Sequence, residues 1–386
     1  ARERVFRCHF SISRWVGALV ILLFVSGRSG SKREAAATSQ PAELPATPAP
    51  PRPTLGKLVE MAPEQLATVD LAEMNLLCAK GLPGAEDLDI EAGLRTLDQW
   101  AAHVGQEIGK RSYQFHENPA RYDRSENLFK LVMLVLTLRE DMGVRYDPAM
   151  MRTATKEGAT EEEIRRDLSD ISVFKNPASV FLSGILSEAR TGTCSSMPVL
   201  YIAVGRRLGF PLKLVATKAH LFLRWDDGEE RFNIEGTGGV DTLPDDYYKK
   251  WPLPVTEEEV ASGQCLKSLS PVEELAVFLQ ARAQCFVANA RYSDAMVAFA
   301  QAHRLVPKNT NREIGLAKTA EAVTAGLKPP PAPDFLADLR RVEEINRASQ
   351  VRTLHDPRPP PASGRFSPGQ DRARPATSPY RPLLVP

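Results

Sequence analysis

Cysteine and histidine are scarce in this sequence, and their spacing forms no metal-binding pattern. The 386 residues include five cysteines and six histidines. No CxxC or CxxxH pair occurs, so the sequence gives no support to a structural zinc site. We expect no metal and no organic cofactor. Four cysteines lie beyond the N-terminal segment, and we expect Cys78, Cys265 and Cys285 to be buried free thiols because their sparse spacing does not resemble a disulfide framework.

An excess of charge of one sign is also missing. Lys and Arg total 49, Asp and Glu total 48, and the net charge is +1 at pH 7. A chain without a strong electrostatic field is a poor candidate for binding nucleic acid, so we expect no nucleic-acid partner. Hydrophobic content of 43% and charged content of 25% are ordinary for a globular protein. The length is sufficient for one large or two modest domains.

The N-terminal segment has no apolar run long enough to span a bilayer. Arginines between Arg2 and Arg14 precede an apolar run from Trp15 to Val25, and SGRSGS follows it. This order is typical of a secretory signal, and the run falls short of the roughly 20 residues that a membrane-spanning helix needs. We therefore predict a signal peptide over residues 1–30 and an exported protein, periplasmic or secreted. The alternative is an uncleaved N-terminal anchor, which would be the chain's attachment to a membrane.

Prolines concentrate in two flanking stretches, and these delimit the folded part. Residues 31–53 are rich in Ala, Pro, Ser and Thr, and residues 351–386 are rich in Pro and Arg. Neither stretch has apolar periodicity, so we predict a disordered linker and a disordered tail. Between them we predict a domain over residues 54–268 and a helical segment over residues 269–350.

The first part of that domain has helical periodicity. Apolar residues from Ile90 to Ile108 recur at spacings of three and four, which predicts an amphipathic helix that begins near Asp89. Residues 63–78 predict an earlier helix, stopped by GLPG. Residues 125–141 are apolar on nearly every face, which is typical of a buried helix.

After Gly192 the pattern changes from helices to strands. A helix that ends near Gly209 is followed by the strand-like runs LKLVAT, HLFLRW and FNIEG. The sequence Asp227-Gly228 predicts a hairpin turn between the last two runs. Helices followed by a helix on an antiparallel sheet predict an α+β fold.

The segment after the sheet has the residue spacing of one tetratricopeptide unit. The matching positions are Leu279, Ala283, Phe286, Ala295, Phe299, Ala302 and Pro307. Arg282 stands where the pattern usually has leucine, and Ala283 where glycine is commoner. One unit alone buries little surface, so we expect it to pack on neighbouring helices or on the sheet domain. Residues 335–350 predict a further amphipathic helix.

Three residues of this second part have the chemistry of a nucleophilic site. Cys194 lies where a helix should begin, and unpaired N–H groups at a helix N-terminus favour the thiolate over the thiol. His220 follows in a strand-like run and is placed to take the thiol proton. Glu235 or Asn233, on the next strand, is placed to orient the imidazole. Together they predict a Cys–His–acid cluster of the kind used in acyl transfer.

Other residues near this cluster suggest further roles. Backbone N–H groups of Thr193 and Cys194 are candidates for an oxyanion hole. Asn233 and Trp225 are candidates for binding the substrate, although for Trp225 core packing is the alternative explanation.

At these residues the chain resembles the transglutaminase-like superfamily, and more closely the bacterial SirB-type transglutaminase-like proteins that append tetratricopeptide units. The resemblance covers roughly Val69 to Asn309 and is most distinctive in GTCSSMPVLYIAVGRRLGFPLKLVATKAHLFLRW, followed by FNIEGT. It implies a papain-like fold, with the cysteine helix packed against an antiparallel sheet. It also implies that Cys194 is the nucleophile, His220 the base and Glu235 the acidic third member, where aspartate is usual.

The leading hypothesis is an exported protein that carries out cysteine-dependent acyl transfer, or amide or peptide hydrolysis. Its substrate would be a protein or peptide. The rival hypothesis is a catalytically silent transglutaminase-like and tetratricopeptide protein that acts as a scaffold for a protein or peptide partner.

Overall fold

The computed structural model describes residues 52–147, 150, 160, 162, 163, 166, 170–237 and 240–324. Within these residues the chain forms helices first, then a small antiparallel sheet, then helices again, so the α+β class is confirmed. Four predicted features lie outside the described residues: the signal peptide, nearly all of the linker, the helix over residues 335–350 and the C-terminal tail. None of the described helices is both long enough and apolar enough to cross a membrane.

The first part of the chain forms the helical layer. Its elements are α1 (Leu55–Glu60), α2 (Pro63–Leu66), α3 (Leu71–Ala79), α4 (Ile90–Glu117), η1 (Pro119–Tyr122) and α5 (Glu126–Glu140). The helix predicted near Asp89 is α4, and the Asp89 side chain accepts from the N–H of Ala92. The helix predicted over residues 63–78 is wrong as a single element, because Asp70 caps a new helix, α3, by accepting from the N–H of Ala72.

Short elements lead from the helical layer to the sheet. They are β1 (Arg145–Tyr146), η4 (Ile171–Lys175), η5 (Pro177–Ser179), α7 (Leu182–Leu186) and β2 (Thr191–Gly192), followed by α8 (Met197–Arg207). β1 and β2 pair in parallel, with Tyr146 opposite Gly192. Sequence patterning did not predict this pairing, since two-residue strands carry no periodicity.

The main sheet has the strand order β3-β4-β5-β6, and every neighbouring pair is antiparallel. Its strands are β3 (Leu212–Thr217), β4 (His220–Asp226), β5 (Arg231–Glu235) and β6 (Asp241–Thr242). The first three are the predicted strand-like runs, and the predicted hairpin at Asp227-Gly228 joins β4 to β5. A connection with α9 (Asp245–Tyr248) and α10 (Glu257–Ala261) follows β6.

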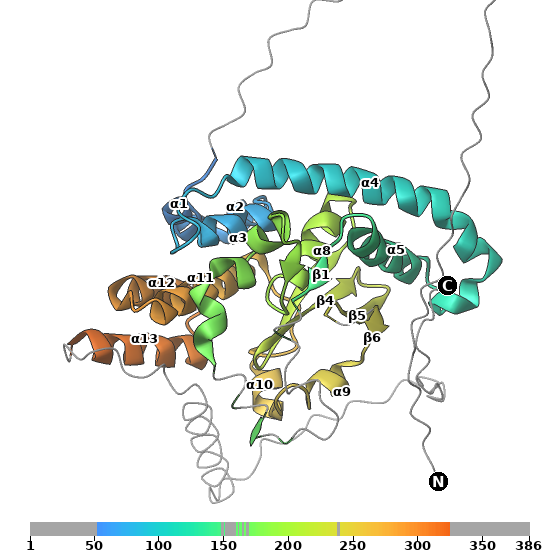
Figure 1. The fold of residues 1–386 in the computed structure, drawn as a ribbon. Helices are drawn as coiled ribbons and strands as arrows, with labels where there is room; N and C mark the ends of the chain where they lie inside the picture. Colours follow the sequence, from blue (N-terminus) through green and yellow to red (C-terminus); the bar gives the residue numbers. More distant parts are fainter. Residues whose placement is uncertain are drawn as a thin grey trace, which may run out of the picture. The chain divides into compact units, whose positions relative to one another are not determined.

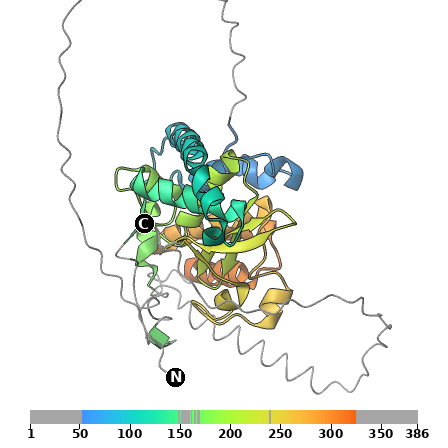
Figure 2. The same cartoon turned by 90° about the vertical axis from the view of Figure 1, so that its right-hand side faces the viewer.

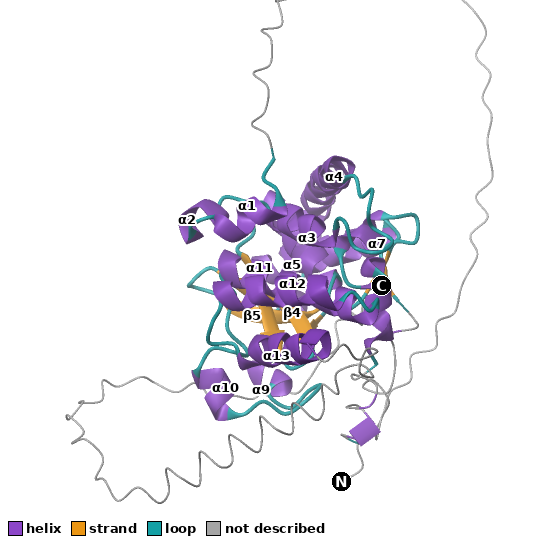
Figure 3. Ribbon diagram, turned by 90° about the vertical axis from the view of Figure 1, so that its left-hand side faces the viewer, coloured by secondary structure: helices purple, strands orange, loops and turns teal. Residues whose placement is uncertain are grey.

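The two faces of this sheet pack against different parts of the chain. Leu214, Leu223 and Ile234 belong to the large core that includes α8 and the helical layer. Val215 and Phe222 belong to a smaller cluster on the other face, which the connection with α9 and α10 covers. The strands therefore lie between α5 and α8 on one side and α9 and α10 on the other, as Figure 1 and Figure 3 show.

The chain then returns to helices. They are α11 (Pro271–Ala288), α12 (Tyr292–Leu305) and α13 (Thr310–Thr324). Each packs on the next, and α11 also packs on α3, so this segment leans on neighbouring helices as expected (Figure 1 and Figure 2). Its tetratricopeptide character stays a prediction.

A close backbone approach joins α7 to η5, just before the segment that carries Cys194. A Cβ atom at Gly184 of α7 would overlap the carbonyl oxygen of Ala178 in η5. The next carbonyl of η5, that of Ser179, accepts a 2.8 Å hydrogen bond from the Thr193 hydroxyl. Glycine at position 184 therefore lets η5 hold the turn in which Cys194 lies.

We predict that Gly184→Ala lowers the free energy of unfolding by at least about 2 kcal/mol, because a backbone carbonyl cannot move aside as a flexible side chain can. Chemical denaturation followed by circular dichroism measures this loss. The matched control is Gly56→Ala in α1, where the nearest atom to the added Cβ is 4.0 Å away. The control should change stability by less than about 1 kcal/mol, in the stabilising direction. Equal stability of the two variants would contradict the prediction.

Candidate active site

His220 and Glu235 meet on the face of the sheet that α9 and α10 cover. His220 begins β4 and Glu235 ends β5. In the antiparallel register Arg224 pairs with Asn233, and alternation puts His220 and Glu235 on this same face. Nε2 of His220 lies 2.8 Å from Oε2 of Glu235, with the two side chains only 3% and 9% exposed. Their spacing along two adjacent strands therefore brings an imidazole and a carboxylate into a buried ion pair.

The charges of this pair stabilise one another. Burial by itself would lower the pKa of His220, but the charge of Glu235 and the hydrogen bond to Cys194 outweigh it and raise the pKa of His220 to about 10. Burial would raise the pKa of Glu235, and the charge and hydrogen bond of His220 outweigh it, so that the pKa of Glu235 is lowered. An imidazolium and a carboxylate are therefore the stable forms at neutral pH.

Cys194 lies beside His220. Its side chain makes a hydrogen bond with His220. Because Glu235 engages Nε2, Nδ1 is the ring nitrogen left for the thiol. Cys194 is partly exposed, whereas Cys78, Cys265 and Cys285 are buried free thiols, as predicted. Burial raises the pKa of each of those three thiols to about 12, which makes them inert.

The helix after Cys194 begins later than predicted. Cys194 lies in a turn, and the first residue of α8 is Met197. Pro198 falls in the first helical turn, where its missing N–H costs nothing. The backbone carbonyl of Thr193 accepts from the N–H of Met197, so the turn continues into the helix without a break. The cysteine is therefore presented just before the helix rather than on it.

Of the two predicted oxyanion donors, the N–H of Thr193 is already used. It donates to Oγ of Ser196 over 3.0 Å, and Thr193 is buried. The N–H of Cys194 lies near the hydroxyl of Tyr146, a residue that sequence analysis did not identify, and it acts to lower the pKa of that hydroxyl. Burial, followed by the charges of Cys194 and Glu235, raises the pKa of Tyr146, so its hydroxyl keeps its proton. No pattern in the sequence singles out Tyr146, because the β1–β2 pairing alone brings it beside Cys194.

Two further residues missed by sequence analysis bind the Glu235 carboxylate. The Tyr248 hydroxyl donates to Oε2 over 3.1 Å. Thr237 donates to Oε1 twice, from its N–H over 3.1 Å and from its hydroxyl over 2.6 Å. Trp251 packs its ring edge-on against His220, with 4.7 Å between the ring centroids. The sequence GTGG after Glu235 could have pointed to Thr237. A polar residue in a short turn lies close to the end of the strand before it and can donate to a side chain there.

The predicted substrate-binding residues, Asn233 and Trp225, are both buried and hydrogen-bonded to neighbouring side chains. Asn233 uses both ends of its amide: Oδ1 accepts from Arg224, and Nδ2 donates to Asp245 and to the Leu243 carbonyl. Trp225 is 4% exposed and lies on the opposite face of the sheet from His220, where it donates to Asp227. Substrate binding by these two residues therefore stays a prediction, because strand alternation shows which residues share a face but not what covers that face.

The site contains no arrangement suited to a metal ion. Within the described part of the chain, no group of three or more His, Cys, Asp or Glu side chains is placed to hold one. His220 and Glu235 also hydrogen-bond to each other, and Glu235 accepts further hydrogen bonds from Thr237 and Tyr248.

Comparison with known proteins points to one family. Residues 168–271 match the model of the Transglutaminase-like superfamily. This segment runs from the approach to η4 through β6 to the start of α11, and it includes Cys194, His220 and Glu235. The chain therefore contains a transglutaminase-like segment, which spans less than half of its length. No curated protein and no solved structure matches the chain.

The raised pKa of His220 predicts an unusual pH dependence of stability. Because the folded pKa of about 10 exceeds the ordinary 6.5, the contribution of His220 is complete below about pH 6.5 and is lost as the pH rises through about 10. The pKa of Glu235 lies below its ordinary 4.5, so its contribution is present above pH 4.5 and is lost as the pH falls further. The stability difference between wild type and His220→Gln should therefore be largest between pH 4.5 and 6.5 and shrink toward pH 10.

Histidine NMR measures this titration directly, with His220 assigned by its absence in His220→Gln. Glu235→Gln should lower the midpoint of His220, because it removes the charge that raises the pKa most. A wild-type His220 that titrates near 6.5 would contradict the assigned electrostatics.

Proposed function

We propose that this chain is an exported transglutaminase-like protein that transfers or hydrolyses the acyl group of a protein or peptide amide through Cys194. In this proposal Cys194 is the nucleophile, His220 moves the proton, and Glu235 orients and stabilises the imidazolium. Export rests on the N-terminal signal pattern, and the SirB-type assignment rests on the residues quoted for it. No metal or organic cofactor is part of the proposal.

One observation carries the proposal. Among the described cysteines, Cys194 alone is partly exposed, and it lies beside a histidine whose Nε2 contacts a buried carboxylate. The nucleophilic form of a cysteine is the thiolate, and a neighbouring histidine is the usual acceptor of the thiol proton. A cysteine with no role in chemistry would more often be buried and without a charged partner.

The chemistry follows from these positions. The Cys194 sulfur attacks the amide carbonyl carbon, the C–N bond breaks, and the amine leaves with the proton of the His220 imidazolium. The acyl group remains as a thioester on the sulfur. Water or a second amine then attacks the thioester carbon and gives its proton to His220, which releases an acid or a new amide and restores the thiolate. The Cys194 N–H is the candidate donor to the oxyanion.

The second candidate function is a silent scaffold. The observation that favours it is the stack of α11, α12 and α13 beside the site segment, since paired helices of this kind offer surfaces for peptides. In that case the Cys194 cluster would be a structural remnant, and a protein or peptide partner would bind without turnover.

Labelling with a cysteine-reactive acyl probe in the full chain distinguishes the two. We expect Cys194 to label faster than a model thiol at neutral pH, Cys194→Ala to abolish that label, and His220→Ala to slow it by at least about 100-fold. Peptide mass spectrometry identifies the modified cysteine and so distinguishes labelling of Cys194 from labelling of Cys8, the cysteine of the N-terminal segment. The matched control is Cys265→Ala, which removes a buried thiol and should leave the labelling rate unchanged. Labelling of wild type no faster than a model thiol, or unchanged in His220→Ala, would favour the scaffold.

A further inference from the structure

The carboxylate of Glu235 is bound by more donors than orienting a histidine requires. Oε2 accepts from His220 at 2.8 Å and from the Tyr248 hydroxyl at 3.1 Å. Oε1 accepts from the N–H and the hydroxyl of Thr237. Thr237 is two residues away and therefore local, but Tyr248 comes from α9, beyond β6. A distant residue thus donates to the same oxygen that contacts the candidate base.

Packing fixes the direction of the Tyr248 hydroxyl. Tyr248 is fully buried, and its ring stacks on Phe222 with 3.8 Å between centroids and 5° between planes. Phe222 is two residues from His220 on the same face of β4. The backbone carbonyl of Tyr248 also accepts a 3.2 Å hydrogen bond from the Thr217 hydroxyl of β3. The ring has little freedom to rotate away from Glu235.

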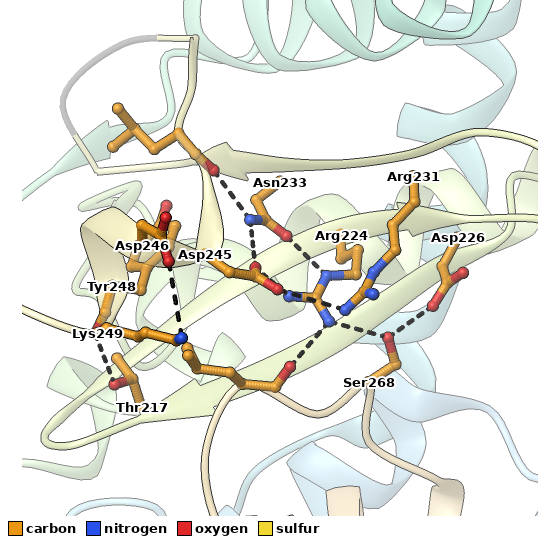
Figure 4. Close-up of polar contacts among 12 residues, drawn as sticks. Thr217, Arg224, Asp226, Arg231, Asn233, Asp245, Asp246, Tyr248, Lys249 and Ser268 are labelled. Carbon is orange, nitrogen blue, oxygen red and sulfur yellow. Dashed lines mark hydrogen bonds and ion pairs between the residues drawn. The ribbon is translucent and has the colours of Figure 1, made fainter. Parts of the chain in front are cut away.

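A buried arginine attaches α9 to the sheet. Arg224 is 0% exposed, and its Nη2 donates to Oδ1 of Asp245, the first residue of α9, over 2.6 Å (Figure 4). Nε of Arg224 donates to Asn233 and Nη1 to the Leu266 carbonyl. Burial lowers the pKa of Arg224, and the charge of Asp245 opposes this effect. An unpaired guanidinium here would be costly, so the pairing with Asp245 is strongly held.

Asn233 completes this attachment. Its Nδ2 donates to Oδ1 of Asp245 and to the carbonyl of Leu243, just before α9. As Figure 4 shows, Arg224 and Asn233 both contact Asp245, three residues before Tyr248. Arg224, Asn233 and Asp245 form what we call the α9 anchor.

We propose that Tyr248 is a positioning residue that acts on His220 through Glu235, and that the α9 anchor holds Tyr248 in place for this task. The inference rests on the proposed function of the Cys194 site. Tyr248 touches no reacting atom. Its hydroxyl draws charge from Oε2 and fixes the plane of the carboxylate, which keeps the imidazolium a competent acid toward the leaving amine.

The test is a double-mutant cycle in the full chain. The measured quantity is the rate at which the cysteine-reactive acyl probe acylates Cys194. Tyr248→Phe keeps the stacked ring and removes one charge-assisted hydrogen bond, so we expect a rate about tenfold lower. In a Glu235→Gln background the same change should alter the rate by less than about twofold, because the acting carboxylate is gone. A second tenfold loss in that background would overturn the proposal, since a purely structural role would be additive.

Two further variants test the anchor and the specificity of the effect. In the wild-type background, Asp245→Asn should lower the acylation rate by part of the amount expected for Tyr248→Phe. In the Tyr248→Phe background, Asp245→Asn should lower the rate no further. An unchanged rate in Asp245→Asn would overturn the role of the anchor. The matched control is Tyr122→Phe, which removes the hydroxyl of another buried tyrosine, one that donates to Gln114 over 3.4 Å. This control should leave the rate within about twofold of wild type.

The NMR titration of His220 tests this inference independently of the proposed function, because it does not require Cys194 to react. Tyr248→Phe should raise the NMR midpoint of His220, because the donor that draws charge from Glu235 is gone, whereas Tyr122→Phe should not move it. If wild-type Cys194 fails to label, the proposed function fails and this titration alone decides whether Tyr248 acts on His220. An unchanged or lowered midpoint in Tyr248→Phe would overturn the inference.

Discussion

The rest of the site depends on the buried hydrogen bond between His220 and Glu235. Burial keeps these two groups paired and so fixes the orientation of the imidazole. In water, an exposed pair of this kind contributes little and exchanges partners freely. Between the sheet and α9, each charge has lost most of its hydration and must keep its protein partners. Loss of one partner of a buried pair typically costs about 3–5 kcal/mol, so the geometry is held firmly. The imidazole therefore has one nitrogen committed to Glu235 and the other left for Cys194.

This requirement explains why the two faces of one small sheet differ. The face toward α8 carries aliphatic side chains that join the large core, and this packing holds the strands in register. The face toward α9 carries His220, Arg224, Asn233 and Glu235, whose polar groups satisfy one another. Once a polar face of this kind is covered and removed from water, its polar groups need hydrogen-bond partners, and the connection through α9 supplies both the cover and several of the partners. The transglutaminase-like match over residues 168–271 includes this whole arrangement.

Long elements were the predictable part of the fold. α4, α5 and strands β3 to β5 all carry periodic apolar patterns, because each buries one face or stripe along many residues. β1, β2, β6, α9 and α10 are too short to show a period, and they were missed or left as loops. The start of α8 was placed three residues early, since a turn that continues into a helix has the same residue preferences as the helix itself. The candidate cluster of Cys194, His220 and Glu235 followed from residue types and order, whereas Tyr146 and Tyr248 have no such signal.

The sequence by itself determined the α+β class, the alternation that puts His220 and Glu235 on one face, and the one cysteine with candidate chemistry. These are local properties, because side-chain direction along a strand repeats every two residues. Only the tertiary structure decided what covers that face and which nitrogen of His220 is committed. It also decided that Asn233 is hydrogen-bonded to Arg224 and Asp245 and that Trp225 is buried on the opposite face of the sheet. Such choices depend on residues that approach through space from α9 and β1, and no pattern along the chain encodes the meeting of distant segments.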